Sequence, residues 1–414
     1  MKVLHTADWH LNDIDHDEIE KCLGYTVAQA RIESPDLIVI PGDITDSQNL
    51  KLDSRASRTM ARIVSELADI APVVIITGTP SHDGRCSEIL RWAKGEHPIW
   101  VSERFEQIYL CHDGKFAFDP SLYEVKAVMT LLPTPTKAYL QDHHKLSIEA
   151  SDQMIGEAMG SIIAGFGIQA KRIAPNSPHI IIGHFQVGGA FISETQQLIG
   201  RDIEVSKDQL ASGNPTLVCL GHIHKAQKMG DNIFYSGSIY RKDFGEMESK
   251  GFFVHTLEPG LKQDGESPEW FIEKSVFIET PTKTLLKLEK DVTAVSIEDL
   301  DDTLLFHFKP EDIKGAHIKV VFTVWQDEAN KINQAAVERF FLEAGAERAI
   351  VSLIRKPRET VRAANVIKFT SLRDKVGEMA NLRQEKVSDE ILDKADLLET
   401  YGPEQLVQRV GEVN

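Results

Sequence analysis

The sequence contains few cysteines and no long apolar run. Its 414 residues include 4 cysteines, which are widely scattered and form no Cys-x-x-Cys pair. A disulfide framework and a thiolate zinc site are therefore disfavoured. No apolar stretch is long enough to span a bilayer, and Met1 leads directly into a predicted strand without a charged and apolar leader. We therefore expect a cytoplasmic protein without membrane attachment.

The chain also lacks the excess of basic residues that is typical of nucleic-acid-binding proteins. Lys and Arg number 46, whereas Asp and Glu number 63, which gives a formal net charge of −17. Because neutralisation of phosphates provides most of the affinity for DNA, this balance counts against a simple DNA-binding protein. A local cluster, Arg355 to Arg358 with Arg362, could still contact phosphates, but a solvated loop explains it equally well.

Polar side chains follow five predicted strands in the first half of the chain. Each strand is a short run of β-branched and apolar residues that ends at a tight turn. Stretches with helical periodicity separate the strands, notably at 17–32, 52–68 and 148–173. The chain is therefore predicted to form an α/β layered domain in which the turns meet at the carboxyl edge of the strands. The five segments are Asp8-Trp-His10, Gly42-Asp43, Gly78 to Asp83, Gly183-His184 and Gly221-His222-Ile-His224.

The side chains at these turns mix carboxylate oxygens with imidazole nitrogens. This mixture suits Mn²⁺, Fe²⁺ or Zn²⁺ better than Ca²⁺. Two such ions, roughly 3.5–4 Å apart, can share one carboxylate and stabilise displacement at a phosphate ester, and we expect Asp43 to be shared. Any single segment also occurs as an ordinary turn or a packed histidine, but the ordered combination predicts a two-metal phosphoesterase. The expected ligands are Asp8, His10, Asp43, His184, His222 and His224.

In type and order, these segments resemble the calcineurin-like metallophosphoesterases over roughly the first two-thirds of the chain. A later stretch, Tyr235 to Glu246 followed by Lys250 to Val254, resembles the segment that closes the nuclease domain of SbcD-type DNA repair nucleases. The resemblance implies an α-β-β-α sandwich and two divalent ions, most often Mn²⁺, with Mg²⁺, Fe²⁺ or Zn²⁺ as alternatives. It also implies DNA as the substrate and an SbcC-type coiled-coil ATPase as the partner.

The resemblance further implies a role for each matching residue. His82 would be the catalytic histidine rather than a ligand, and it would stabilise charge on the phosphate or protonate the leaving 3′ oxygen. Asp83 would orient the ring of His82. The implied ligands are Asp8, His10, Asp43 and His224 for one ion, and Asp43, His184 and His222 for the other.

The third segment departs from the family pattern Gly-Asn-His-Asp. It reads Gly78-Thr79-Pro80-Ser81-His82-Asp83, which is longer by two residues and lacks the asparagine that binds the second ion in the family. We expect the Ser81 hydroxyl to bind this ion, with Thr79 or water as alternatives. Because a hydroxyl is a weaker donor than an amide carbonyl, the second ion should be bound more loosely. Weak or absent catalysis therefore also stays open.

Asp46 allows two interpretations. In the pattern Gly-Asp-x-x-Asp it could hydrogen-bond to a ligand histidine and so orient the ring without binding the ion itself. It could instead cap the helix that follows. The sequence favours neither.

The pattern of elements divides the chain into three predicted domains. The phosphoesterase domain would span 1–279 and end at a linker. A small α/β capping domain is predicted at 284–370, and by resemblance it would select the shape of the DNA. The tail, 371–414, is predicted to form amphipathic helices, which could bind the ATPase or fold back onto their own protein.

The preferred function is a Mn²⁺-dependent DNA nuclease in end processing and in double-strand break repair or recombination. By resemblance it would cleave from 3′ ends and at hairpins or single strands. One alternative is a phosphodiesterase acting on a small nucleotide or a phosphoprotein, because a fold does not fix its substrate. Another is a weakly active subunit that positions DNA. A homodimer through the helices at 17–32 and 52–68 is also open.

Overall fold

The computed structural model divides the chain into two compact units. One comprises 1–289, 298–321 and 334–352, and the other comprises 290–297, 322–333 and 353–414. The three predicted domain boundaries stay predictions. Among the described residues, no helix has the length and apolarity needed to cross a membrane. The residues that the structure describes are 1–84, 86–121, 123–144, 147, 152–196, 203–261, 268–294, 308–358, 366–402 and 405.

The first sheet has six strands in the order β15-β14-β1-β2-β3-β4. Strands β1 to β4 run parallel, whereas β14 is antiparallel to β1 and to β15. The strands β2 and β3 are buried along their whole length, because helices cover one face and the second sheet covers the other. The strands are β1 (Lys2–His5), β2 (Leu37–Pro41), β3 (Val73–Ile76), β4 (Ile99–Ser102), β14 (Gly251–Leu261) and β15 (Pro268–Glu279).

The second sheet has seven strands in the order β12-β13-β11-β8-β7-β5-β6. Its central strands β7, β8, β11 and β13 are parallel. The carboxyl ends of β8 and β11 therefore lie side by side. The strands are β5 (Glu106–Cys111), β6 (Phe116–Ala117), β7 (Val125–Leu132), β8 (His179–His184), β11 (Leu217–Gly221), β12 (Gln227–Lys228) and β13 (Ile233–Tyr235).

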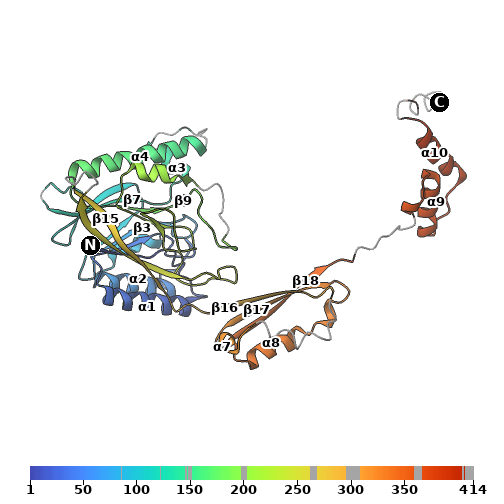
Figure 1. Ribbon diagram of the computed structural model, residues 1–414, viewed down its shortest axis with the longest axis horizontal. Coiled ribbons are helices and arrows are strands. Elements are labelled where there is room, and N and C mark those ends of the chain that lie inside the picture. Colours follow the sequence, from blue (N-terminus) through green and yellow to red (C-terminus); the bar gives the residue numbers. More distant parts are fainter. Residues whose placement is uncertain are drawn as a thin grey trace. The chain divides into compact units, whose positions relative to one another are not determined.

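Three apolar layers hold the two sheets and the helices together. One layer lies between the first sheet and the helices α1 (His16–Glu33) and α2 (Arg55–Ala68). A second lies between the two sheets. The third lies between the second sheet and the helices α4 (Asp152–Ile173) and α5 (Lys207–Ser212). This α-β-β-α order, visible in Figure 1, confirms the predicted α/β fold class.

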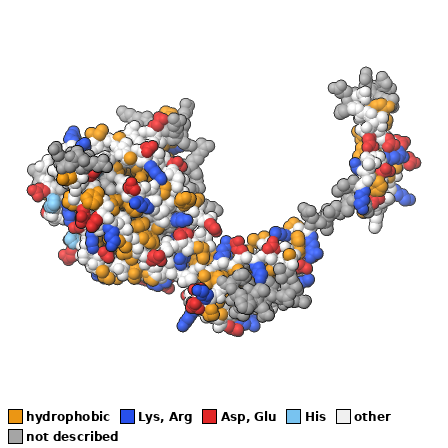
Figure 2. All heavy atoms as spheres, viewed as in Figure 1, with side chains coloured by type: hydrophobic (Ala, Val, Ile, Leu, Met, Phe, Trp, Pro, Cys, Tyr) orange, Lys and Arg blue, Asp and Glu red, His pale blue; other side chains and the backbone are white. Residues whose placement is uncertain are grey.

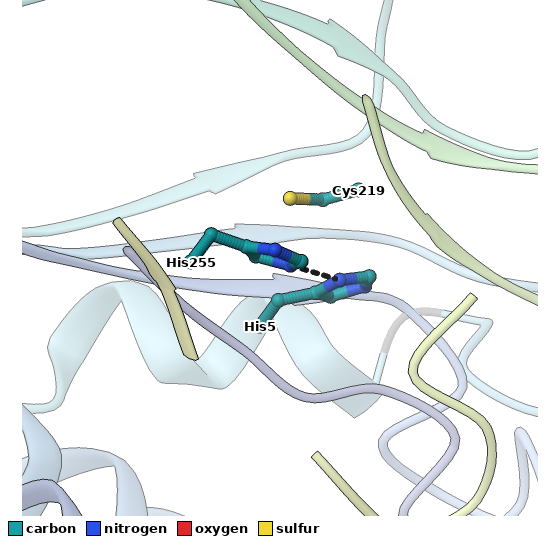
Figure 3. Close-up of side chains that lie close together, drawn as sticks. All are labelled: His5, Cys219 and His255. Carbon is teal, nitrogen blue, oxygen red and sulfur yellow. Dashed lines mark hydrogen bonds between the residues drawn. The ribbon is translucent and has the colours of Figure 1, made fainter. Parts of the chain in front are cut away.

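A pair of buried histidines joins the two sheets in the middle layer. The Nε2 atom of His5, in β1, donates to the carbonyl of Leu220, in β11, at 3.0 Å. The Nε2 atom of His255 lies 3.5 Å from Nδ1 of His5, and its own Nδ1 accepts from Ser275 at 2.8 Å. Figure 3 shows the two rings one over the other, with Cys219 beside them. Burial lowers the pKa of His5 to about 3, so the ring is neutral.

This histidine pair is a packing element of the core rather than a metal site. Both ring nitrogens of His5 and both of His255 already have a hydrogen-bond partner, so none is left to bind an ion. The bond between His5 and Leu220 instead ties together the two strands that lead to Asp8 and His222. It therefore fixes the distance between two of the predicted metal-binding turns.

The remaining strands and helices are mostly in the second half of the chain. A three-stranded sheet has the order β16-β17-β18. Helices α9 and α10 pack as a pair, and Arg373 joins them by ion pairs to Asp393 and Asp396. Figure 2 shows acidic, basic and apolar side chains interspersed over this pair. The elements are α3 (Lys137–His144), β9 (Gln186–Val187), β10 (Glu204–Val205), β16 (Leu285–Asp291), α7 (Pro310–Ile313), β17 (His317–Trp325), α8 (Gln334–Glu343), β18 (Arg348–Lys356), α9 (Leu372–Arg383) and α10 (Asp389–Thr400).

Candidate metal centre

The turns that follow β1, β2 and β11 have an uncommon backbone conformation. Asp8, His10, Asp43 and His222 have positive φ angles of 51°, 44°, 49° and 91°. Residues other than glycine seldom adopt this region, and each such position costs on the order of 1–3 kcal/mol. The concentration of four of them at the predicted metal turns indicates that the fold stabilises these conformations in order to aim the side chains inward.

Glycines allow the same turns to approach each other very closely. A Cβ atom on Gly221 would lie 2.1 Å from the carbonyl oxygen of Pro41, and one on Gly42 would lie 2.5 Å from Cα of Gly78. A Cβ atom on Gly78 would lie 2.2 Å from the amide nitrogen of Asp43. Any larger residue would push these turns apart, and the polar side chains beside them would no longer converge.

Asp43 lies at the centre of the cluster. Its Oδ2 atom is 3.3 Å from Nε2 of His184 and 3.9 Å from Nε2 of His10. Ligand atoms of Asp8, Asp43 and His184 all lie within 4.8 Å of one another. A carboxylate with histidines on both sides is the arrangement that a ligand shared by two ions requires.

Asp8 provides a test of whether a cation fits this site. Its Oδ1 atom accepts a hydrogen bond from the backbone N–H of His222 at 2.9 Å. Its Oδ2 atom is buried and has no hydrogen-bond partner in the described part of the chain. Because an unpaired buried carboxylate oxygen is costly, this atom indicates a position for a positive ion.

Hydrogen bonds orient the rings of His184 and His224. In each ring the bond is made by Nδ1, which faces away from the cluster. Nδ1 of His184 donates to the carbonyl of Pro41 at 2.6 Å, so Nε2 faces Asp43. Nδ1 of His224 donates to the carboxylate of Glu246 at 2.6 Å, and its Nε2 atom lies 2.9 Å from Nε2 of His10. Metal-binding histidines are typically fixed in this way by a carbonyl or a carboxylate.

Burial and the neighbouring charges set the ionisation of the cluster. Burial favours the neutral form of Asp43, but the surrounding histidines, led by His184, outweigh it and hold the pKa of Asp43 well below its usual range. Burial likewise opposes a charge on His184, yet Asp43 raises the pKa of His184 to about 9. The pKa of Asp8 is raised, chiefly by desolvation. The position beside Asp43 therefore attracts positive charge, and the proton on His184 must leave before the imidazole can bind a metal.

His82 and Asp46 lie on the His10 side of the cluster. The rings of His82 and His10 are nearly perpendicular, with centroids 4.8 Å apart. Nδ1 of His82 donates to the backbone carbonyl of Asp46 at 2.9 Å. The carboxylate of Asp46 lies 3.4 Å from Nδ1 of His10 and accepts from Lys242 at 2.6 Å.

These contacts decide between the two interpretations of Asp46. Burial favours its neutral form, but His10 and Lys242 outweigh burial and lower its pKa to about 2, so it is ionised. The N-cap of α2 is Ser54, whose side chain accepts from the amide of Ser57. The carboxylate of Asp46 therefore lies beside the ring of His10, as the first interpretation predicts, and Ser54 rather than Asp46 caps the helix.

Asp83 has a different role from the predicted one. Its buried carboxylate accepts hydrogen bonds from the amides of Thr45, at 3.0 Å, and Gly78, at 2.7 Å. These two N–H groups lie in tight turns and need an acceptor. Burial, together with Asp43, raises the pKa of Asp83 to about 6. Asp83 thus braces the turns, whereas the carbonyl of Asp46 orients His82.

The hydroxyl beside the cluster comes from Thr79 and not from Ser81. Oγ1 of Thr79 lies 3.3 Å from Oδ2 of Asp43 and 3.3 Å from Nε2 of His184, and its amide donates to Asp43 at 2.6 Å. Ser81 is exposed, and its carbonyl accepts from the amide of Gln48. The two additional residues form an outward turn, so the residue directly after Gly78 occupies the position at the cluster.

Three residues that support the cluster were missed in the sequence. Glu246 orients His224, and the buried Lys250 lies 3.2 Å from Glu246 and donates to the carbonyl of His224 at 3.0 Å. Gln196 donates to the carbonyl of His222 at 2.5 Å and accepts from the amide of His224 at 3.0 Å. Glu246 and Lys250 belong to the stretch that carried the second resemblance, which was the available signal for them.

Comparison with known proteins places this centre in a class. The family model for the calcineurin-like phosphoesterases matches residues 1–226, and the chain belongs to that family. Its centre is accordingly that of a metal-dependent phosphoesterase. The chain is 28% identical over 329 residues to the SbcD subunit of the nuclease SbcCD from Staphylococcus epidermidis, and the match covers 75% of this chain and 78% of that protein. The crystal structure of a dimetal phosphatase from Danio rerio covers 68% of this chain and 99% of its own at 14% identity, with a TM-score of 0.38.

The carboxylate behind His224 gives a first prediction. Glu246→Gln keeps the shape of the side chain but removes the charge that orients and polarises the imidazole. We expect the affinity for Mn²⁺ to fall about 10- to 100-fold, measured by isothermal titration calorimetry. The exposed Glu258→Gln serves as the control and should bind as the unaltered protein does. Equal affinity in the two variants would contradict the role of Glu246.

Proposed function

We propose that the centre holds two divalent ions, most favourably Mn²⁺, with Mg²⁺, Fe²⁺ or Zn²⁺ as alternatives, and hydrolyses phosphodiester bonds of DNA. The observation that carries the proposal is the position of Asp43 Oδ2 between Nε2 of His184 and Nε2 of His10. The proposed ligands are Asp8, His10, Asp43 and His224 for one ion, and Asp43, His184 and His222, with the hydroxyl of Thr79, for the other.

The proposed reaction uses the bound ions and the side chain of His82 for different steps. When bound, the ions would supply an activated water and positive charge at the phosphate. Because Nδ1 of His82 is engaged by the carbonyl of Asp46, its Nε2 atom is the one that can meet the substrate. We assign to that atom the stabilisation of charge on the phosphate or the protonation of the leaving 3′ oxygen.

DNA as the substrate is supported by the likeness to a protein that is named as part of a nuclease. By that likeness we propose 3′ exonuclease activity and cleavage of hairpins or single strands, in end processing and in double-strand break repair or recombination. The basic cluster at 355–358 supports DNA binding less well, because Arg358 pairs with Asp327 and Glu328, both at 3.2 Å. Arg362 lies outside the described residues. The ions themselves would therefore provide most of the positive charge at the site.

A phosphodiesterase acting on a small nucleotide is the second candidate. A cavity of about 440 Å³ lies beside His184 and His222, and its other walls include Pro135 and Phe185. This volume is within the range of small-molecule sites and accommodates one nucleotide. The same cavity would also accept the last nucleotide of a DNA strand, so the two substrates must be compared directly.

Substitution of His82 tests its catalytic role, and a comparison of two substrates separates the DNA nuclease from the small-nucleotide enzyme. His82→Ala should reduce Mn²⁺-dependent cleavage of single-stranded and hairpin DNA by about 10²- to 10⁴-fold. Binding of Mn²⁺ should be unchanged in calorimetry, because His82 is not a proposed ligand. The exposed His112→Ala is the matched control. Cleavage of a cyclic nucleotide but not of DNA by the unaltered protein would favour the small-nucleotide enzyme.

The hydroxyl of Thr79 leads to a prediction about the second ion. Titration with Mn²⁺ should resolve two classes of site, with the weaker one on the side of His184 and His222, since a hydroxyl replaces the amide of the family. Thr79→Asn should strengthen the weaker class. Two equal affinities in the unaltered protein would refute this difference.

We propose that the C-terminal helices bind the coiled coil of an SbcC-type ATPase. Support comes from apolar side chains on α10 that are exposed in the described part of the chain: Ile391 is 49% and Leu398 is 60% accessible. The residues 403–404 and 406–414 of the predicted tail lie outside the described part. A capping domain that selects DNA shape, a homodimer and a cytoplasmic location stay predictions.

Removal of the tail tests the partner assignment. Deletion of 371–414 should abolish co-purification with the ATPase, whereas hydrolysis of a small phosphodiester by the isolated chain should remain. Leu398→Glu should weaken co-purification without altering the helix pair, because this side chain is exposed. A truncated chain that still captures the ATPase would exclude the tail as the binding segment.

A further inference from the structure

An exposed aromatic ring lies on the loop that follows β9. Phe191 is 71% accessible. Single exposed apolar side chains are common and carry no meaning by themselves. Here, however, the backbone is clamped: the amide of Phe191 donates to Oε1 of Gln227 at 2.9 Å, and Nε2 of Gln227 donates to the carbonyl of Phe191 at 2.7 Å. The ring is therefore presented to solvent from a fixed backbone position.

The clamp connects Phe191 to the segment that carries two metal-binding histidines. Gln227 also donates to the carbonyl of Lys225, which directly follows His224. Farther along the loop of Phe191, Gln196 bonds the backbone of both His222 and His224. The loop and the histidine segment are thus joined at two points, so the backbone of Phe191 is held to the segment that carries His222 and His224.

The ammonium group of Lys225 lies close to the ring of Phe191. Nζ of Lys225 lies over one face of the Phe191 ring, 5.8 Å from its centroid, so a base would stack on the opposite face. An aromatic face with a neighbouring lysine is the combination that binds unpaired nucleotides, because the base stacks on the ring while the ammonium group meets the phosphate backbone. A partner protein could use an exposed phenylalanine as well. The lysine and the connection to the histidines favour a nucleotide.

We propose that Phe191 and Lys225 form a stacking platform for an unpaired base next to the phosphodiester that is cleaved. The inference rests on the proposed function and deepens it. A base inside a duplex is already stacked on its neighbours and does not offer a free face. The platform would therefore favour single-stranded, frayed or hairpin-loop substrates over intact duplex.

Binding of a single-stranded phosphorothioate oligonucleotide, followed by fluorescence anisotropy, tests the platform. Phe191→Leu retains an apolar side chain but removes the aromatic face, and it should weaken binding about 5- to 100-fold. Phe191→Trp should bind as the unaltered protein does, with quenching of its fluorescence by the oligonucleotide. The control is Phe118→Leu, since Phe118 is 64% accessible and follows β6. Hydrolysis of bis(p-nitrophenyl) phosphate should be unchanged in all three variants.

The possible results separate this inference from the function on which it rests. Unaltered oligonucleotide binding by Phe191→Leu, in a protein that cleaves DNA, overturns the platform alone. An equal loss of oligonucleotide binding and of bis(p-nitrophenyl) phosphate hydrolysis would show a structural role and also overturn it. Loss of ATPase capture with oligonucleotide binding intact would assign the ring to a protein interface. An unaltered protein that hydrolyses the small substrate but neither binds nor cleaves DNA refutes the proposed function and the platform together.

Discussion

Backbone turns at the carboxyl edges of the two sheets touch one another, and this contact sets the geometry of the metal centre. The turns after β2, β3 and β11 approach so closely that Gly42, Gly78 and Gly221 have no room for a Cβ atom. This contact places Asp43 between histidines from different sheets. The bond between His5 and Leu220 maintains the same spacing deeper in the core. The centre is therefore a property of how the sheets pack and not of any one loop.

The metal centre lowers the stability of the fold, because it buries charged groups and holds residues in unfavourable backbone conformations. Buried carboxylates and imidazoles lie together, and four of the residues have a positive φ angle. Supporting groups make the arrangement stable: the carbonyl of Pro41 holds His184, and Glu246 holds His224. Glu246 is in turn paired with Lys250, which also bonds Glu248. Such outer partners restrict the ring positions before any ion binds, which reduces the reorganisation that binding requires.

The sequence predicts the layered fold, because a strand followed by a tight turn is a local pattern with a fixed geometric outcome. The structure brings the side chains of the expected ligands close together, with the rings of His184 and His222 5.3 Å apart, and their role as ligands stays a prediction. It does not predict which hydroxyl faces the cluster, since the path of the lengthened turn at 78–83 depends on hydrogen bonds from Gln48 to Ser81 and from Thr45 to His82. The sequence also does not reveal that Asp83 accepts hydrogen bonds from Thr45 and Gly78 rather than orienting His82. Its hydrogen-bond donors are backbone amides of other turns, and no periodicity marks such partners. Gln196 lies 28 positions from His224, and no local pattern marks it. Glu246 lies 22 positions from His224, and only the second resemblance pointed to it.

The separation of the ligands along the chain has a consequence for biogenesis. His10 and His224 are 214 positions apart, yet their Nε2 atoms meet. Strand β1 also needs β14 as its antiparallel neighbour, and β14 begins at Gly251. A polypeptide still emerging from the ribosome thus holds only isolated carboxylates and imidazoles with little ability to retain an ion. Metal loading is consequently a late event, and products of premature termination would remain inert toward phosphodiesters.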